Sequence, residues 1–436
     1  MTGSQWGLLA PEQLSSTRRT RTLGLGASVR QFNELAVPGI GGVRYGRQVL
    51  FTALSMAVAK RVEHWNVRVT HIEIANAIEA VACIIGYREN GWTANPRLRG
   101  RNKLPDDATS PSFKSARKRN FHVAQPMRMS TAQALPSLGL ADTQSARFNA
   151  FECNDNVDVF LSLSLEGLTV GNNNVLDHLS YWVCGSQLKW GSNGLTKALN
   201  PLRPLPPSAS AWLKNSLLQG LALNPVLRQR RQNAWQWITR LRSQPDTVES
   251  LADAKAPAEL DQQHWHDLRA GAQLVAVREA AIEVLNSVEQ VLEARKVRSL
   301  SLTQKLPDPV TVALKALGAQ ARTFLTLRHH DEDANLFCSE CQAGDVNALR
   351  ALLQRDDQVL RLVDDCARPG PAYTGHPPVA LLSAEKEADG EAEADDRTVA
   401  VPVGVSYRVR NLYLLQMDLD DTSERQTAEE SERKAV

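Results

Sequence analysis

Two stretches of the chain combine clustered cations with aromatic side chains, the residue types that contact the phosphates and bases of nucleic acids. The first stretch, residues 95–129, is rich in proline and interleaves its cations with Phe113, followed by Phe121 and His122. It is expected to form a long basic loop or arm. Its candidate phosphate contacts are Arg97, Arg99, Arg101, Lys103, Lys114, Arg117, Lys118 and Arg119.

The second basic stretch, residues 228–242, places five arginines around Trp235 and Trp237 on a predicted helix. Residues three and seven positions apart lie on the same helical face, so Arg228, Arg231 and Trp235 are expected to share one. The candidate contacts here are Arg228, Arg230 and Arg231. For either stretch alone, a solvated charged face beside core aromatics is the favoured interpretation.

The net charge of +2 conceals a division of charge along the chain. Residues 1–250 hold 29 Lys and Arg against 16 Asp and Glu, whereas residues 251–436 hold 21 against 32. Such polarity makes the first half a candidate for phosphate-rich partners and the second for basic partners, or lets the two halves attract each other. Together with the two basic stretches, this charge favours nucleic acid.

A Cys-x-x-Cys pair, Cys338 and Cys341, is the principal candidate for metal chemistry. Zinc takes four tetrahedral sulfur or nitrogen ligands, which this pair could supply together with His330 upstream and Cys366 downstream. A second Cys-x-x-Cys pair is absent from the sequence. Buried packing thiols or a redox pair are therefore the alternatives to zinc.

Several other patterns resemble functional motifs but lack the residues or the setting that those motifs need. The glycine-rich run at 38–48 has neither the spacing nor the Lys-Ser/Thr ending of a phosphate-binding loop, which leaves close backbone turns as its interpretation. Pro245-Asp246 and Asp253-x-Lys255 match a loose nuclease pattern without a buried strand beside it. The helix pair at 47–87 is not a helix-turn-helix, because the second helix carries Glu73 and Glu79 in a mostly apolar context.

The cysteines and the apolar runs indicate the compartment. Six cysteines spread over 436 residues indicate no disulfide framework. The first residues lack the basic and apolar regions of a secretion signal. No apolar run reaches the roughly 18 residues of a membrane-spanning helix. A reducing, cytoplasmic location without a membrane partner is expected.

Helix signals are clearest at two places. Thr70 and Glu73 stand in capping-box spacing before a helix expected at 71–87. At 261–297, apolar residues alternate at spacings of three and four, which predicts a buried stripe in a helix bundle or, as the alternative, a dimer seam. Glu289 is expected to be exposed beside this stripe. The stripe consists of Ala270, Leu274, Val277, Ala281, Val284, Val288 and Val291.

These signals predict a mainly α fold with minor β, with prolines at 200–210 separating two helical domains. Alternation of Val399, Val401, Val403, Val405, Tyr407 and Val409 predicts a strand near the C-terminus. The expected organisation is a partly flexible lead-in (1–35), an α-rich N-terminal domain (36–200), a second helical domain (210–365), an acidic linker (366–397), a β element (398–417) and a disordered acidic tail (418–436).

The leading functional hypothesis is a non-catalytic or accessory nucleic-acid-binding subunit of a bacterial multiprotein assembly, in a setting such as defence or a mobile element. Its expected partners are DNA or RNA and, through the acidic half, other protein subunits. One alternative is a zinc-dependent enzyme that uses residues 329–366. The other is a protein-protein scaffold.

Overall fold

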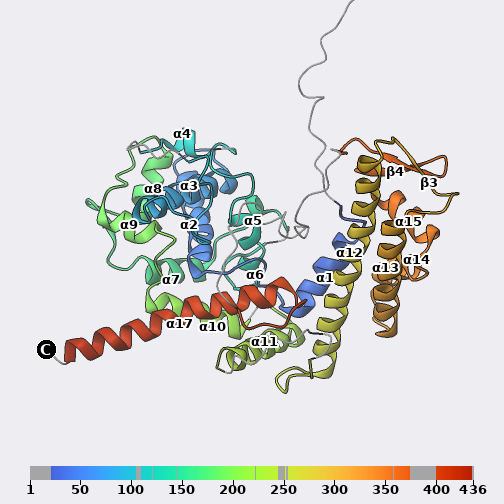
Figure 1. Cartoon of the computed structure of the whole chain (residues 1–436). Helices are drawn as coiled ribbons and strands as arrows, with labels where there is room; N and C mark the ends of the chain where they lie inside the picture. Colours follow the sequence, from blue (N-terminus) through green and yellow to red (C-terminus); the bar gives the residue numbers. More distant parts are fainter. Residues whose placement is uncertain are drawn as a thin grey trace, which may run out of the picture. The chain divides into compact units, whose positions relative to one another are not determined.

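Helices dominate the computed structural model of the chain (Figure 1). The structure describes residues 21–104, 110–119, 121–143, 145–220, 222–243, 251, 254–356, 358–373 and 399–434, the last fourteen of these by their backbone alone. Among these residues the sheets are two small antiparallel ones, β1–β2 and β3–β5–β4. The prediction of a mainly α fold with minor β is confirmed. No described helix is both long enough and apolar enough to cross a membrane.

The elements follow one another along the chain as α-helices of four to 33 residues interrupted by strands of two to four residues. In order they include α1 (Gly26–Ala36), α2 (Gly46–Glu63), α3 (His71–Glu89), α4 (Phe113–Ala116), α5 (Arg128–Thr131), α6 (Ala134–Ser137), α7 (Asp155–Ser164), β1 (Thr169–Val170), β2 (Asn173–Asn174), α8 (Val175–Val183), α9 (Asn193–Leu199), α10 (Pro207–Gln219), α11 (Pro225–Ser243), α12 (Gln262–Ala294), β3 (Leu300–Ser301), α13 (Asp308–Thr326), α14 (Glu332–Cys341), α15 (Val346–Asp356), β4 (Leu360–Val363), β5 (Cys366–Pro369) and α17 (Tyr407–Lys434).

Contacts divide the described residues into two compact units. The first unit comprises residues 21–31 and 270–373, and the second comprises residues 32–269 and 399–434. The expected domain boundary at 200–210 lies inside the second unit, because α10 contacts α7, α11 and α17. The division therefore falls within α1 and α12 rather than at the proline-rich stretch.

The core of the second unit is built on α2 and α3, which pack against each other. The predicted capping box starts α3: Thr70 Oγ1 accepts a hydrogen bond from the Glu73 amide at 3.2 Å, and Glu73 Oε2 accepts one from the Thr70 amide at 3.0 Å. Both helices are buried along most of their length, with Val58 and Ile78 almost fully enclosed. Their interpretation as core helices is confirmed.

The glycines before α2 allow two backbone segments to meet. The Gly42 amide donates a hydrogen bond to Ser130 O at 2.8 Å. A Cβ on Gly41 would lie 2.7 Å from the same carbonyl oxygen, and Gly41 has a φ of +57°, which other residues adopt at a cost. The glycine-rich run is thus a close-approach turn, as the sequence indicated.

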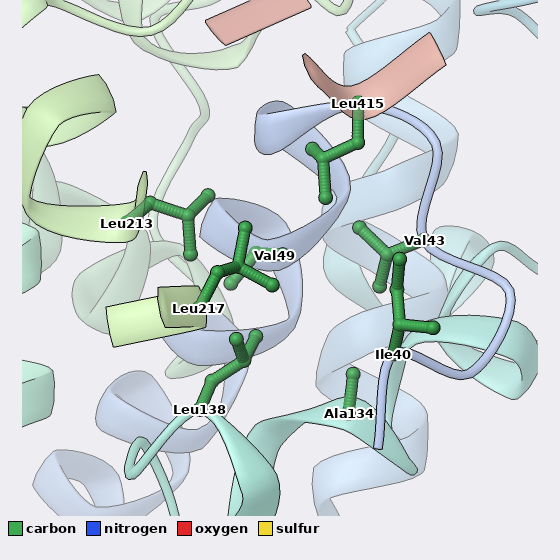
Figure 2. Close-up of a pocket in the computed structure, with 8 residues that line it drawn as sticks. All are labelled: Ile40, Val43, Val49, Ala134, Leu138, Leu213, Leu217 and Leu415. Atoms are coloured by element: carbon green, nitrogen blue, oxygen red, sulfur yellow. The ribbon is translucent and has the colours of Figure 1, made fainter. Parts of the chain in front are cut away.

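A cluster of aliphatic side chains fills the space beneath α2 in the second unit. Figure 2 shows it, with contributions from α2 and the segment before it, from α6 and the residue that follows it, and from α10 and α17. The side chains leave no space for a water molecule, so the cluster is packed core rather than a ligand pocket. The eight residues are Ile40, Val43, Val49, Ala134, Leu138, Leu213, Leu217 and Leu415.

The β element predicted at 398–417 and the disordered tail predicted at 418–436 are wrong for their described residues, 399–434. Tyr407–Lys434 form helix α17, and residues 399–406 belong to neither described sheet. Val409, Leu412 and Leu419 are buried at helical spacing, which outweighs the shorter alternation before them. The tail that follows is rich in helix-forming Glu, Arg and Ala. A short β element does lie near the C-terminus, at β4 and β5.

The first unit is organised around α12, whose predicted apolar stripe is confirmed. All seven stripe residues are buried, and Val284 is completely enclosed. After α12 in the sequence, α13 contacts α14, and α14 contacts α15. The expected acidic linker is wrong at its start, because Cys366–Pro369 form β5, which pairs with both β3 and β4. Residues 374–397 of that linker lie outside the described residues.

The described part of the lead-in expected at 1–35, residues 21–35, is packed into the fold. Leu23 and Leu25 are 1% exposed, and α1 begins at Gly26. Arg21 is buried and forms ion pairs with Glu289 of α12 and, at 3.2 Å between Nε and Oδ2, with Asp356 of α15. Residues 1–20 lie outside the described part of the chain.

The same contact overturns the expectation that Glu289 is exposed. Its side chain is completely buried, one position from the stripe residue Val288, because the Arg21 guanidinium supplies a partner for its carboxylate. Arg21 Nη1 also donates to Asn286 Oδ1 at 2.7 Å. A heptad pattern cannot show this partner, which comes from 268 residues earlier in the sequence.

Glu289→Lys should strongly destabilise the first unit, by about 3–5 kcal/mol, because it places a second buried cation against Arg21. Gln290→Lys changes charge at the next, exposed position of α12 and should alter the free energy of unfolding by less than about 1 kcal/mol. Chemical denaturation of both variants checks the difference. Equal stability of the two would contradict the buried pair.

Candidate functional site

The segment 95–129, expected to be a basic arm, is packed against the core of the second unit. Leu98, Leu104 and Met127 are buried in one cluster with Tyr87 of α3. Helix α4, which lies within the segment, contacts α3 as well. The described backbone of the segment, residues 95–104, 110–119 and 121–129, is therefore held against this core, and its cations divide into buried and exposed ones.

Arg97 and Arg99, the first two predicted phosphate contacts, serve the fold instead. Arg97 Nη2 lies 2.6 Å from Asp418 Oδ1 of α17, and its guanidinium carbon lies 4.2 Å from the centre of the Tyr45 ring. Arg99 is 2% exposed and donates from Nη1 to Gln125 O at 2.9 Å. Neither guanidinium is on an open surface.

Arg99 also lies in the field of a buried carboxylate, Glu79 of α3. Glu79 Oε1 accepts a hydrogen bond from the Met127 amide at 2.8 Å and lies 3.4 Å from His122 Nε2. Burial raises the pKa of Glu79, and the charge of Arg99 opposes that rise. Burial lowers the pKa of His122 to about 3, with Arg99 and Lys103 adding to the effect. Glu79 therefore ties the segment around residue 127 to α3.

An open cleft of about 630 Å³ lies between the start of α3 and this tied segment. We call it the basic cleft. Three of its cations, Arg117, Lys118 and Arg119, follow α4, and the fourth, Arg128, begins α5. Ile72 and Met129 supply apolar surface to its lining. The fold thus brings together cations from two parts of the chain.

The basic cleft keeps most of its positive charge. Its one acidic side chain, Glu73, pairs with Arg117 at 3.3 Å between Oε1 and Nη1, with both groups more than a third exposed. Such exposed pairs are weak, about 1 kcal/mol or less, and readily exchange partners. Arg128 Nε donates to Asn76 Oδ1 at 3.0 Å. Burial lowers the pKa of Arg128, and Arg119 adds to that effect, yet a guanidinium stays charged at neutral pH.

The remaining predicted cations of the segment are exposed on the second unit but do not line the basic cleft. They are Arg101, Lys103 and Lys114. Lys114 is on α4, three positions before Arg117. Of the eight cations predicted in this segment, the structure therefore brings three together in the cleft, buries or pairs two, and leaves three elsewhere on the surface.

The second predicted basic stretch, in α11, does not form an open cationic face. Arg230 is buried, with its Nη1 2.6 Å from Asp267 Oδ2. Arg231 is buried too and donates to the side chain and carbonyl of Ser137, both at 3.3 Å. Arg228 is half-buried, and both tryptophans of the stretch are buried. A structural role, in which the tryptophans belong to the core, describes this helix better than a role in nucleic-acid contact.

The predicted zinc ligands are not brought together. Cys338 and Cys341 lie on α14 and are buried, His330 is exposed, and Cys366 is half-buried on β5. All four belong to the described part of the chain, and no three of them place their ligand atoms within 4.8 Å of one another. Burial raises the pKa of both α14 thiols to about 12, so they stay protonated, as packing thiols do.

Comparisons with known proteins add no family to this geometry. No protein-family model, no curated protein and no solved structure matches the chain. The candidate site is therefore defined by the charge and shape of the basic cleft itself.

Sequence reasoning missed three residues that shape the cleft. Arg128 ends the basic segment, but its role as the fourth cation of the cleft depends on the fold of residues 121–127. Asn76 and Glu79 hold that segment from α3, and both looked like ordinary core-helix positions. A polar residue inside an otherwise apolar helix was the one available signal, because a buried polar group requires a partner.

His122 should make the protein less stable in mild acid. Its folded pKa of about 3 is below the unfolded value of 6.5, so the unfolded state binds more protons and stability is lost as the pH falls from 6.5 towards 3. At pH 5 this loss is about 2 kcal/mol. Chemical denaturation at pH 7 and pH 5 should show a smaller pH dependence for His122→Gln than for the wild type. The same pH dependence in both would contradict the buried neutral imidazole.

Proposed function

We propose that the second unit binds nucleic acid through the basic cleft, as the accessory, phosphate-contacting part of a larger assembly. The observation that supports the proposal is the convergence of Arg117, Lys118, Arg119 and Arg128 on one open cleft with a single, weakly paired acid. A polyanion gains by replacing the counterions of its phosphates with such a cluster. Arginine suits this role because its planar donors match two phosphate oxygens at once.

The lining of the basic cleft also suits a nucleotide better than a simple inorganic anion. Ile72 and Met129 place apolar surface beside the cations. Met129 is about half exposed, and a flexible thioether packs well against a flat ring. The cleft therefore offers contacts both to phosphate oxygens and to the apolar faces of sugar or base. DNA and RNA share this chemistry, and both are within the proposal.

The alternatives have less support. For a zinc enzyme at residues 329–366, the four predicted ligands are described and do not come together, as stated above. A scaffold role for the acidic half has support only from its charge, and part of that charge is already used within the second unit. Asp420 of α17, for example, lies 3.1 Å from Lys214 Nζ and 2.6 Å from Arg242 Nη1.

Lys118→Glu combined with Arg119→Glu should raise the Kd for a short oligonucleotide at least about tenfold in low salt, because two phosphate contacts become repulsive. Both side chains are exposed, so the fold should be retained. The slope of log K against log salt concentration should fall by about 1.4 for a single strand and about 1.8 for a duplex. Fluorescence anisotropy with a labelled oligonucleotide over a salt series measures both quantities.

The matched control carries the same charge change on exposed residues of the first unit, Arg298→Glu with Lys315→Glu. It should leave the Kd within about twofold of the wild type if the cleft, rather than net charge, determines affinity. No binding by the wild type at low salt, or equal losses in the two double variants, would overturn the proposal.

A further inference from the structure

A stacked pair of exposed aromatic rings lies elsewhere on the second unit. Trp65 follows the C-terminal end of α2, and Tyr181 is on α8. The ring centres are 5.3 Å apart with an interplanar angle of 13°, the geometry of offset stacking. The two residues are 39% and 43% exposed, so a large part of each ring faces solvent.

The surroundings of the pair are rigid and partly cationic. The Trp65 amide donates to Val62 O at 3.0 Å, which continues the end of α2. Arg61, one turn earlier, forms an ion pair with Asp177 of α8 and is 44% exposed there. This pair joins the two elements that carry the rings. Lys60, also exposed, precedes Arg61 on α2.

Helix α8 is also attached to the segment that leads into the basic cleft. Trp182, next to Tyr181, is buried and donates from Nε1 to Pro111 O at 3.2 Å. Its ring meets the Phe113 ring edge-on at 5.4 Å between centres. The guanidinium carbon of Arg117, a cleft residue, lies 5.8 Å from the centre of the same Phe113 ring. The aromatic pair and the cleft therefore belong to one packed body.

We propose that Trp65 and Tyr181 form a stacking platform for unpaired bases, so that the nucleic acid bound by the second unit is single-stranded. This inference rests on the proposed function. Each ring gives one face to its partner, and a base that stacks on the solvent-exposed part of either ring extends the pair. Stacking is tolerant of sequence and contributes about 1–3 kcal/mol per base. A duplex hides its base faces, so it gains nothing from such a platform.

The test uses the full chain and three labelled probes of about 16 nucleotides: a mixed-sequence single strand, its duplex, and an abasic strand of the same length. Trp65→Ala with Tyr181→Ala should raise the Kd for the single strand about tenfold or more. The Kd values for the duplex and the abasic strand should change by less than about twofold. Trp65→Phe with Tyr181→Phe should keep most of the single-strand affinity, because flat rings remain.

The cleft variant Lys118→Glu with Arg119→Glu separates this inference from the proposed function, because it should weaken binding of all three probes. If the cleft variant weakens binding and the alanine pair does not, the platform is overturned and the cleft stands. If neither variant changes binding, both are overturned. Two further results would overturn base stacking. One is an equal loss of affinity for the single strand, the duplex and the abasic strand in the alanine pair. The other is a protein that binds a neutral polysaccharide and none of the three nucleic-acid probes.

Discussion

The basic cleft depends on a carboxylate that never reaches its surface. Glu79 is enclosed in α3 and accepts a hydrogen bond from the Met127 amide at 2.8 Å, next to the residue that begins α5. A buried carboxylate is costly unless hydrogen bonds and cations offset its lost hydration. The backbone at residue 127 and the nearby charge of Arg99 provide that compensation. Because the segment must approach Glu79 to do so, Arg128 is held at the cleft.

Much of the opposite charge carried by the two halves of the sequence is neutralised by ion pairs within the molecule. Asp418 of α17 pairs with Arg97 and accepts a hydrogen bond from the Gly46 amide at 2.8 Å, and Asp420 of α17 pairs with Lys214 and Arg242. These contacts attach the C-terminal helix to the N-terminal part of the second unit. The attraction between the halves that the charge count allowed is therefore present in α17. A cluster that remains open to a polyanion is the one in the basic cleft.

The sequence predicted those elements that interactions between neighbouring residues determine. A capping box at Thr70 and a stripe of apolar residues in α12 each specify a helix without reference to distant residues, and both were found. The strand expected around Val405 failed because two local patterns overlapped, and the helical spacing from Val409 onward buries more apolar surface. The exposed position expected for Glu289 failed because its partner, Arg21, is remote in the sequence.

The candidate site likewise has features that the local sequence indicated and features that depend on residues far apart in the chain. The cation cluster at 117–119 was visible in the sequence as residue types. That Arg97 and Arg99 do not join this cluster follows from their own contacts, with Asp418 and Gln125 respectively. The stacked pair of Trp65 and Tyr181 joins residues 116 positions apart, and no spacing rule connects them. Composition therefore indicated the chemistry, and tertiary contacts selected which residues can perform it.

Amide hydrogen exchange in Glu79→Gln tests most directly whether Glu79 holds the cleft wall. The variant keeps the side-chain shape but loses the charge, and a hydrogen bond to a charged group contributes about 1.5–3 kcal/mol. The account predicts that residues 121–131 exchange at least about tenfold faster than in the wild type, while α2 in the same unit is unchanged. Unchanged exchange at 121–131, or equal acceleration in α2, would contradict it.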